Sequence, residues 1–159
     1  MPKITPFLWF DHQAEEAANF YTSVFKNSKI ISTTRYGDAG PGPKGSVMTV
    51  GIEIDGQALT CFNGGPAHTF TDAISFAVHC DSQQEIDDYW EKLTSGGGKE
   101  IACGWLVDKF GMSWQIVPKG FIEMMLDPDP QKQQRVFRAM LPMKKLDLRA
   151  LEAAYKGAQ

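Results

Sequence analysis

The sequence contains the segment Cys103-Gly104-Trp105-Leu106-Val107-Asp108-Lys109-Phe110-Gly111-Met112-Ser113-Trp114-Gln115-Ile116-Val117-Pro118, which predicts two β-strands joined by a tight turn. Residues 105–107 form a short apolar run, and residues 113–117 alternate between polar and apolar side chains, as strands with one buried face do. Asp108 suits the first position of a type I turn, where its carboxylate accepts a backbone N–H. Gly111 can adopt the positive φ that lets the second strand leave the turn in register. The segment therefore predicts a β-hairpin.

The length and composition predict a chain with a sizeable hydrophobic core. It has 159 residues, 43% of them hydrophobic, so we expect one globular domain or two small fused modules. A net charge of −3 and a pI near 5.6 do not favour binding to nucleic acid or to a membrane. Cys61, Cys80 and Cys103 form no CxxC pair, which is typical of free thiols in a reducing compartment. We therefore expect a cytoplasmic protein.

Two successive stretches of the chain show the same order of predicted elements: a strand, a helix and three further strands. The first stretch is predicted to contain a strand at 4–10, a helix at 14–25 and strands at 29–36, 46–54 and 57–63. The second is predicted to contain a strand at 73–80, a helix with a capping box at Ser82 and Glu85, a short strand at 99–102 and the hairpin. This repetition indicates an internal duplication.

The last part of the chain has a different character and is predicted to be helical. Asp129 followed by Pro130 predicts the start of one helix, and Asp147 and Gly157 predict the start and the end of another. We expect an amphipathic tail that either covers the parent sheet or contacts a second subunit, and we favour a homodimer. The domain organisation that we expect is a first βαβββ module at 1–66, a second at 67–120 and a helical tail at 121–159, in one structural domain overall.

Several motifs give the chain a resemblance to a known family. They are Ile4-Thr5-Pro6-Phe7-Leu8-Trp9-Phe10-Asp11, Ala14-Glu15-Glu16-Ala17, Asn63-Gly64-Gly65-Pro66, Ala73-Ile74-Ser75-Phe76, Tyr89-Trp90-Glu91-Lys92-Leu93 and the segment 103–115. In these motifs the chain resembles the PhnB-like (3-demethylubiquinone-9 3-methyltransferase-like) family of the vicinal oxygen chelate superfamily. The resemblance implies an α+β fold in which two βαβββ modules form a cupped mixed sheet, with C-terminal helices added.

The resemblance also implies where a metal ion would be held, because metalloenzymes of the superfamily bind a divalent ion through His and Glu at four strand positions. Carried over to this chain, these positions fall at Pro6 (Ile4 in another alignment), Leu59, Ala73 and Gln115. None is a histidine or a carboxylate, which a divalent ion needs to offset its loss of water. We therefore expect no metal and no cofactor.

Residues that alternate with these four positions are predicted to line a pocket. The candidate pocket residues are Leu8, Phe10, Cys61, Asn63, Ser75, His79, Trp105, Ser113 and Gln115. Such a lining is mostly apolar, with a few hydroxyl, amide and imidazole groups, and it suits an aromatic or amphipathic molecule. The alternative is that these side chains simply fill the concave face of the sheet. His79 is the best acid or base by type, although a single histidine at a strand end is more often structural.

Three classes of function remain open. The first is a metal-free protein that binds, and need not turn over, a small aromatic or quinone-like molecule. The second is an enzyme of the superfamily, with His79, Gln115 or Ser75 taking part, or a methyltransferase as the family label says. For the latter the sequence shows no GxGxxG turn that opens a helix. The third is an interaction domain whose tail binds a partner.

Overall fold

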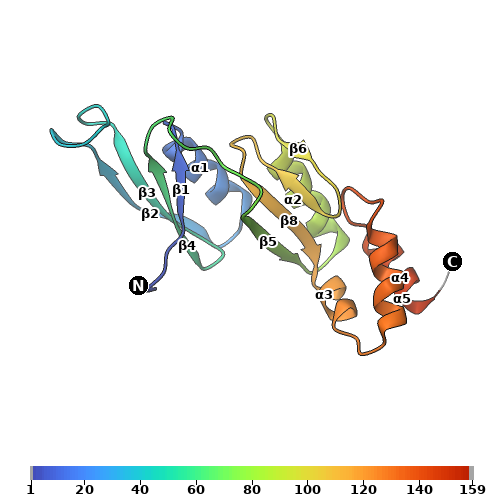
Figure 1. Ribbon diagram of the computed structural model, residues 1–159. Helices are drawn as coiled ribbons and strands as arrows, with labels where there is room; N and C mark the ends of the chain where they lie inside the picture. The colour runs from blue at the N-terminus through green and yellow to red at the C-terminus, as the bar shows by residue number, and fades with distance from the viewer. Residues whose placement is uncertain (1, 158–159) are drawn as a thin grey trace. The chain divides into compact units, whose positions relative to one another are not determined.

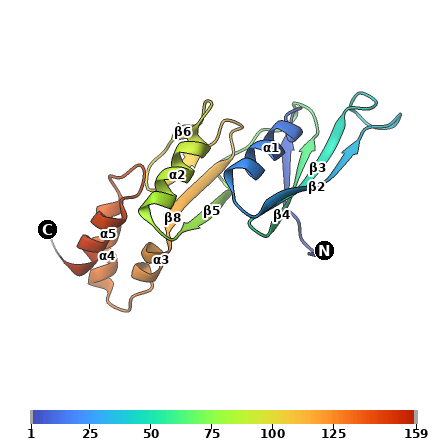
Figure 2. The same ribbon diagram turned by 180° about the vertical axis from the view of Figure 1, so that it is seen from behind.

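The computed structural model describes residues 2–157. The chain divides into two compact units, Met1–Phe70 (unit 1) and Thr71–Gln159 (unit 2), which Figures 1 and 2 show from opposite sides. Each unit has a four-stranded mixed β-sheet with a helix against one face, and unit 2 continues into three more helices. This confirms the predicted α+β fold of two βαβββ modules with C-terminal helices.

Unit 1 consists of β1 (Phe7–Phe10), α1 (Ala14–Val24), β2 (Ser28–Arg35), β3 (Val47–Ile54) and β4 (Gln57–Asn63). The strands lie in the order β1-β4-β3-β2, with β1 parallel to β4 and the other pairs antiparallel. The β3–β4 hairpin turns at Asp55 and Gly56, whose φ angles are 45° and 83°. Two-residue turns of the primed types favour such an Asp-Gly pair because it tolerates positive φ.

Unit 2 begins with the same sequence of elements. They are β5 (Ser75–Cys80), α2 (Gln83–Thr94), β6 (Lys99–Glu100), β7 (Trp105–Val107), β8 (Ser113–Pro118), α3 (Lys119–Met125), α4 (Pro130–Met140) and α5 (Leu148–Lys156). The strand order β5-β8-β7-β6, with β5 parallel to β8, is that of unit 1. No helix in the described part of the chain has the length and apolar character of a membrane span.

In each unit a helix covers one side of the sheet (Figure 2), and strand residues on that side form a buried core. The core of unit 1 includes Leu8, Val50, Ile52 and Leu59 of the strands and Ala17, Ala18 and Tyr21 of α1. The core of unit 2 includes Leu106, Trp114 and Ile116 of the strands and Ile86, Trp90 and Leu93 of α2. Because successive side chains of a strand point to opposite faces, the remaining residues lie on the other side, which we call the open face.

The hairpin of β7 and β8 is held by a buried carboxylate. Asp108 is only 2% exposed, and its Oδ1 accepts the backbone N–H groups of Phe110 (2.9 Å) and Met112 (3.0 Å). Its Oδ2 accepts the indole N–H of Trp114 at 2.9 Å. The predicted turn is therefore present, and its aspartate also fixes a core tryptophan of the next strand.

The segment between α4 and α5 is attached to the beginning of β7. The N–H groups of Cys103 and Gly104 donate to the carbonyl oxygens of Met143 (2.7 Å) and Lys144 (2.8 Å). Both donors have positive φ, 59° and 85°. A Cβ on Gly104 would lie 3.0 Å from the side chain of Leu146, which explains the glycine.

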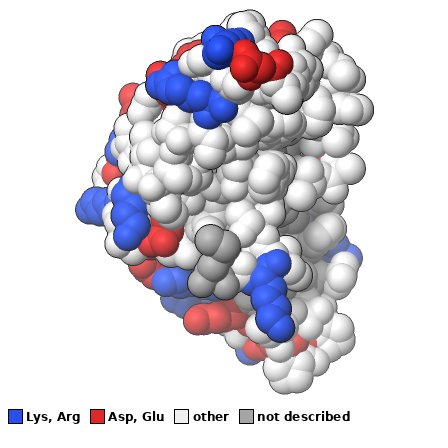
Figure 3. All heavy atoms as spheres, turned by 90° about the vertical axis from the view of Figure 1, so that its left-hand side faces the viewer, with Lys and Arg blue, Asp and Glu red and all other residues white. Residues whose placement is uncertain are grey.

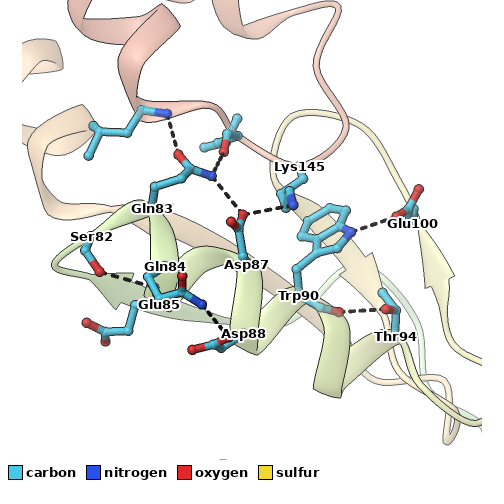
Figure 4. A network of polar contacts seen from close by, with 12 residues as sticks. Ser82, Gln83, Gln84, Glu85, Asp87, Asp88, Trp90, Thr94, Glu100 and Lys145 are labelled. Carbon is cyan, nitrogen blue, oxygen red and sulfur yellow. Dashed lines mark hydrogen bonds and ion pairs between the residues drawn. The ribbon is translucent and has the colours of Figure 1, made fainter.

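A side chain of α2 makes the second attachment (Figure 4). The Gln83 amide donates to the carbonyl of Leu146 (3.0 Å) and accepts the N–H of Leu148 (2.8 Å), the first residue of α5. It also donates to Asp87, whose carboxylate pairs with Lys145 at 2.9 Å. The tail thus packs on its own unit, around a small core that consists of Met124, Val136, Met140, Leu146 and Leu151.

Candidate functional site

An exposed aromatic group lies on the open face of unit 1. Phe7 and Trp9 come from β1, and Phe62 comes from the neighbouring strand β4. The Phe62 ring meets the Trp9 ring edge to face at 5.0 Å and lies 6.3 Å from that of Phe7. Phe7 is 63% exposed, and Trp9 and Phe62 are half-buried. We call these three residues the aromatic group.

The turn after β4 fixes the Trp9 indole. Its N–H donates to the carbonyl of Gly65 at 2.9 Å, and the ring of His68 meets it edge to face at 4.7 Å. A Cβ on Gly64 would lie only 2.3 Å from the Trp9 ring and 2.7 Å from the Phe62 ring. Glycine is therefore required at position 64 because the two rings lie against its backbone.

The predicted pocket residues of unit 1 lie on the other face. Leu8, Phe10 and Cys61 are buried in the core against α1, at most 4% exposed. The prediction placed them in the pocket because it assumed that Pro6 and Leu59 face the pocket and that every second residue does the same. A shift of one residue moves all side chains of a strand to the opposite face. Phe7, Trp9 and Phe62 occupy the open face in their place. Burial also raises the pKa of Cys61 to about 12, so this thiol stays protonated.

Asn63, the fourth predicted residue of unit 1, joins three segments. Its side-chain oxygen accepts the N–H of Ala14 at the start of α1 (2.8 Å), and its amide donates to the carbonyl of Val47 at the start of β3 (3.1 Å). Gln13, at the N-cap position, makes no side-chain capping bond, so Asn63 serves as a cap supplied from another strand. Its side-chain amide therefore stabilises the fold of unit 1 by joining these segments.

The predicted residues of unit 2 are brought together on one face. Ser75 pairs in register with Ser113, and Trp105 pairs with Gln115. The Gln115 amide donates to the Ser75 hydroxyl at 3.0 Å, and His79 is exposed further along β5. All five are on the strand face opposite Phe76, Trp114 and Ile116, because they alternate with these residues.

The donor set does not fit the divalent ion that the superfamily implies. Of Pro6, Leu59, Ala73 and Gln115, only Gln115 has a donor atom in its side chain. Within residues 2–157, no group of three or more His, Cys, Asp and Glu side chains is placed to hold a metal ion. Divalent transition metals need imidazole, thiolate or carboxylate ligands. Neither open face presents them as a set.

One side of the protein carries few charged side chains over much of its area. Figure 3, which views the protein from the side of β2 and β3, shows broad uncharged areas between the charged side chains. On β2 and β3 the hydroxyl groups of Thr34 and Thr49 are hydrogen-bonded at 2.5 Å, and Thr49 pairs with Phe62 of the aromatic group. The open face of unit 1 thus places two threonine hydroxyl groups beside the aromatic group.

Comparisons with known proteins place these features in a family. Residues 2–117 match the family model described as 3-demethylubiquinone-9 3-methyltransferase. A PhnB protein from Bacillus cereus, described as a candidate 3-demethylubiquinone-9 3-methyltransferase, is 40% identical; the match covers 74% of this chain and 99% of that chain, with a TM-score of 0.67. No curated protein matched the sequence.

Two more distant structures share the fold alone. Protein PA1353 from Pseudomonas aeruginosa is 19% identical, with a TM-score of 0.61 and coverage of 74% of this chain and 98% of that chain. The fosfomycin resistance protein FosX from Listeria monocytogenes, in complex with Mn(II) and sulfate, is 13% identical, with a TM-score of 0.51 and coverage of 74% and 91%. The family match ends at residue 117, so helices α3 to α5 lie outside it.

Proposed function

The chain belongs to the PhnB-like 3-demethylubiquinone-9 3-methyltransferase family of the vicinal oxygen chelate superfamily, and we propose that it binds a small aromatic or quinone-like molecule on the open face of unit 1 without a metal ion. The aromatic group carries this proposal. Flat rings bind to exposed aromatic side chains by offset or edge-to-face stacking, worth about 0.5–1.5 kcal/mol per pair beyond the area buried.

The arrangement of the aromatic group supports binding rather than mere packing. Core aromatic residues such as Trp114 and Tyr21 are at most 1% exposed, whereas Phe7 is largely exposed and Trp9 and Phe62 are half-buried. Their orientation is set by the hydrogen bond to Gly65 and by the missing side chain at Gly64. A preformed apolar surface of this kind lowers the entropic cost of binding.

The predicted residues of unit 2 form a separate, more polar candidate surface, except Ser113, which is only 1% exposed. Ser75 and Gln115 offer hydroxyl and amide groups to the carbonyl oxygens of a quinone-like molecule, Trp105 offers a ring, and His79 offers an imidazole. These assignments remain predictions, as do a homodimer and a cytoplasmic location. We place the primary site on unit 1 because its aromatic side chains are the more exposed.

Methyl transfer, which the family description names, is less well supported than binding. Doubly wound sheets that bind nucleotide-like cofactors carry a Gly-rich turn between a strand and a helix. Here the Gly-rich segment 37–45 joins the antiparallel strands β2 and β3. The thiols of Cys61 and Cys80 have pKa values raised to about 12, mainly by burial, so neither suits the role of a nucleophile.

The proposal is tested by NMR of the four tryptophan indole N–H groups during titration with duroquinone. This quinone is fully substituted, so addition of cysteine thiols to its ring is suppressed. We expect the Trp9 indole signal to shift in a saturable way, while those of buried Trp90 and Trp114 stay in place. Phe62→Leu should raise the Kd about fivefold, since one ring contact is lost. A shift of Trp105 without Trp9, or no saturable shift at all, would contradict a site on unit 1.

A further inference from the structure

Unit 1 contains a cavity that the aromatic group does not line. Its volume is about 580 Å³, within the range of about 300–1,000 Å³ that is typical of small-molecule sites. Three segments enclose it: the beginning of α1 with the residues before it, the segment 36–47, and the turn after β4. We call it the end cavity, and its lining consists of Asp11, His12, Glu15, Tyr36, Pro41, Gly42, Pro43, Ser46, Val47, Asn63, Gly64, Gly65 and Pro66.

The walls of the end cavity are tied together by hydrogen bonds. The Tyr36 hydroxyl donates to the carbonyl of Asn63 at 2.5 Å, and the Asn63 side chain binds the backbone of Ala14 and Val47. All three enclosing segments are therefore joined through one residue. Tyr36 is only 6% exposed. The cavity is thus formed by fixed groups, as small-molecule sites usually are.

The glycine-rich segment 37–45 forms one wall in a defined conformation. The Gly45 N–H donates to the Tyr36 carbonyl (2.7 Å), and the Ser46 N–H donates to the Pro43 carbonyl (3.0 Å). A Cβ on Gly42 would lie 2.3 Å from the Tyr36 ring, so the backbone of this segment rests on the ring. This wall brings Pro41 and Pro43 to the cavity as apolar surfaces.

The charges that line the end cavity have one sign. Asp11 and Glu15 are its carboxylates, and no lysine or arginine is among the described lining residues. Two cations adjoin lining residues in the sequence without lining the cavity: Lys44 pairs with Asp38 at 2.9 Å, and the Arg35 guanidinium donates to the carbonyl of Gly45 at 3.1 Å. His12 lies 3.5 Å from Asp11 and is largely exposed. A ligand that enters therefore meets two carboxylates together with proline, valine and backbone surfaces.

We propose that the end cavity binds a small organic cation, an amine or a quaternary ammonium group on a compact apolar body. The carboxylates would attract the charge, and the proline and valine surfaces would contact the apolar body. Acidic residues in the first turn of α1 also favour the helix by themselves, and both Glu15 and Glu16 do so. Only Glu15 of the two lines the cavity, and this difference provides a matched control.

The test compares choline with 3,3-dimethylbutan-1-ol, its neutral analogue of nearly the same shape, by two-dimensional NMR titration of the full-length protein. We expect choline to shift backbone signals of Tyr36, Ser46 and Gly65 in a saturable way, and the neutral analogue to bind at least about fivefold more weakly. Equal binding of the two compounds would overturn the proposal. So would the absence of a saturable shift when choline reaches ~10 mM, about a 50-fold molar excess over the protein.

Charge-removing variants locate the binding. Asp11→Asn with Glu15→Gln should weaken choline binding about five- to tenfold, whereas Glu16→Gln should leave it within about twofold, because two partly exposed ion pairs are lost only in the former. If Glu16→Gln weakens binding as much as the double variant, long-range attraction accounts for the effect and the assigned site is refuted. Amide signals far from the cavity show that each variant is folded.

Discussion

The two units have the same strand order and the same parallel pair, yet their open faces differ. Unit 1 presents Phe7, Trp9 and Phe62, whereas unit 2 presents hydroxyl and amide groups centred on Ser75 and Gln115. The faces that pack on a helix are alike in both, because each must bury an apolar surface. A duplicated fold thus preserves backbone pairing and the buried face, and the open faces are where the two copies differ in chemistry.

The equivalent hairpins differ in the same manner. Asp55 of unit 1 lies in an exposed two-residue turn, where it adopts a positive φ. Asp108 of unit 2 is buried and accepts three hydrogen bonds. Unit 2 is also the one that carries a helical tail, attached through Gln83 and the N–H groups of Cys103 and Gly104. Matched substitutions in the two units can measure these differences.

The largest effect is expected from Asp→Asn in the two hairpins. Asp108→Asn keeps one acceptor oxygen but turns an NH₂ group towards partners that need an acceptor, and we expect a loss of about 2–4 kcal/mol in the free energy of unfolding. Asp55→Asn should change it by less than about 0.5 kcal/mol, since Asn-Gly also suits the turn. Urea unfolding followed by tryptophan fluorescence measures both. Equal losses in the free energy of unfolding would show that the two aspartates contribute equally to stability.

The next effect concerns the open face of unit 1. In Gly64→Ala the new methyl group would meet the rings of Trp9 and Phe62, and overpacking of this kind costs about 1–3 kcal/mol. The Trp9 indole signal should move while that of Trp105 in unit 2 stays. Gly37→Ala is the control, because a Cβ there meets nothing within 4 Å and φ is not positive. An unchanged Trp9 signal in Gly64→Ala would mean that the rings are not fixed as described.

Much of the fold follows from local patterns in the sequence. Turn residues predict the two hairpins, at Asp55-Gly56 and at 108–111. Cap residues predict the starts of three helices, at Ser82, Asp129 and Asp147. Their signals are local, because a cap or a tight turn depends on a few neighbouring residues. The mixed sheet of two βαβββ modules also followed, through the resemblance and the repeated pattern.

The candidate site was harder to predict, and the strand β1 shows why. Both of its faces read as apolar, since Phe7, Leu8, Trp9 and Phe10 follow one another, so the sequence has no alternation to show which face is buried. In β8 polar and apolar residues alternate, and the open face with Ser113 and Gln115 could be assigned. The glycine at 64, next to two aromatic strands, is the signal that points to close approach of a ring. The end cavity had no such signal, because it depends on segments brought together by Asn63.

A smaller effect is expected where the tail meets α2. Gln83→Ala removes the bonds to Leu146, Leu148 and Asp87 and should lower the free energy of unfolding of unit 2 by about 1–2 kcal/mol. Its neighbour Gln84 bonds only to Asp88 on the exposed face of the same helix, among the bonds described, so Gln84→Ala should cost less than about 0.5 kcal/mol. Limited proteolysis of the segment 143–148 should be faster in Gln83→Ala. Equal rates in both variants would show that Gln83 does not hold the tail.

The smallest effect is the pH dependence of the same attachment. Hydrogen bonds from Lys145 and Gln83 lower the pKa of Asp87, so the ionised form is favoured in the folded state. A group whose folded-state pKa is lowered contributes stability above its unfolded pKa, near 4, and loses it as the pH falls through the lower folded value. Because both partners are about 40% exposed, the contribution is at most about 0.5 kcal/mol and weakens in salt. The stability difference between the native protein and Lys145→Met should therefore be measurable at pH 6 in low salt and should decrease as the pH falls below about 4. A difference that does not change between pH 6 and the acid range would instead reflect packing of the lysine chain, and the comparison of the two units would then rest on the Gln83 bonds alone.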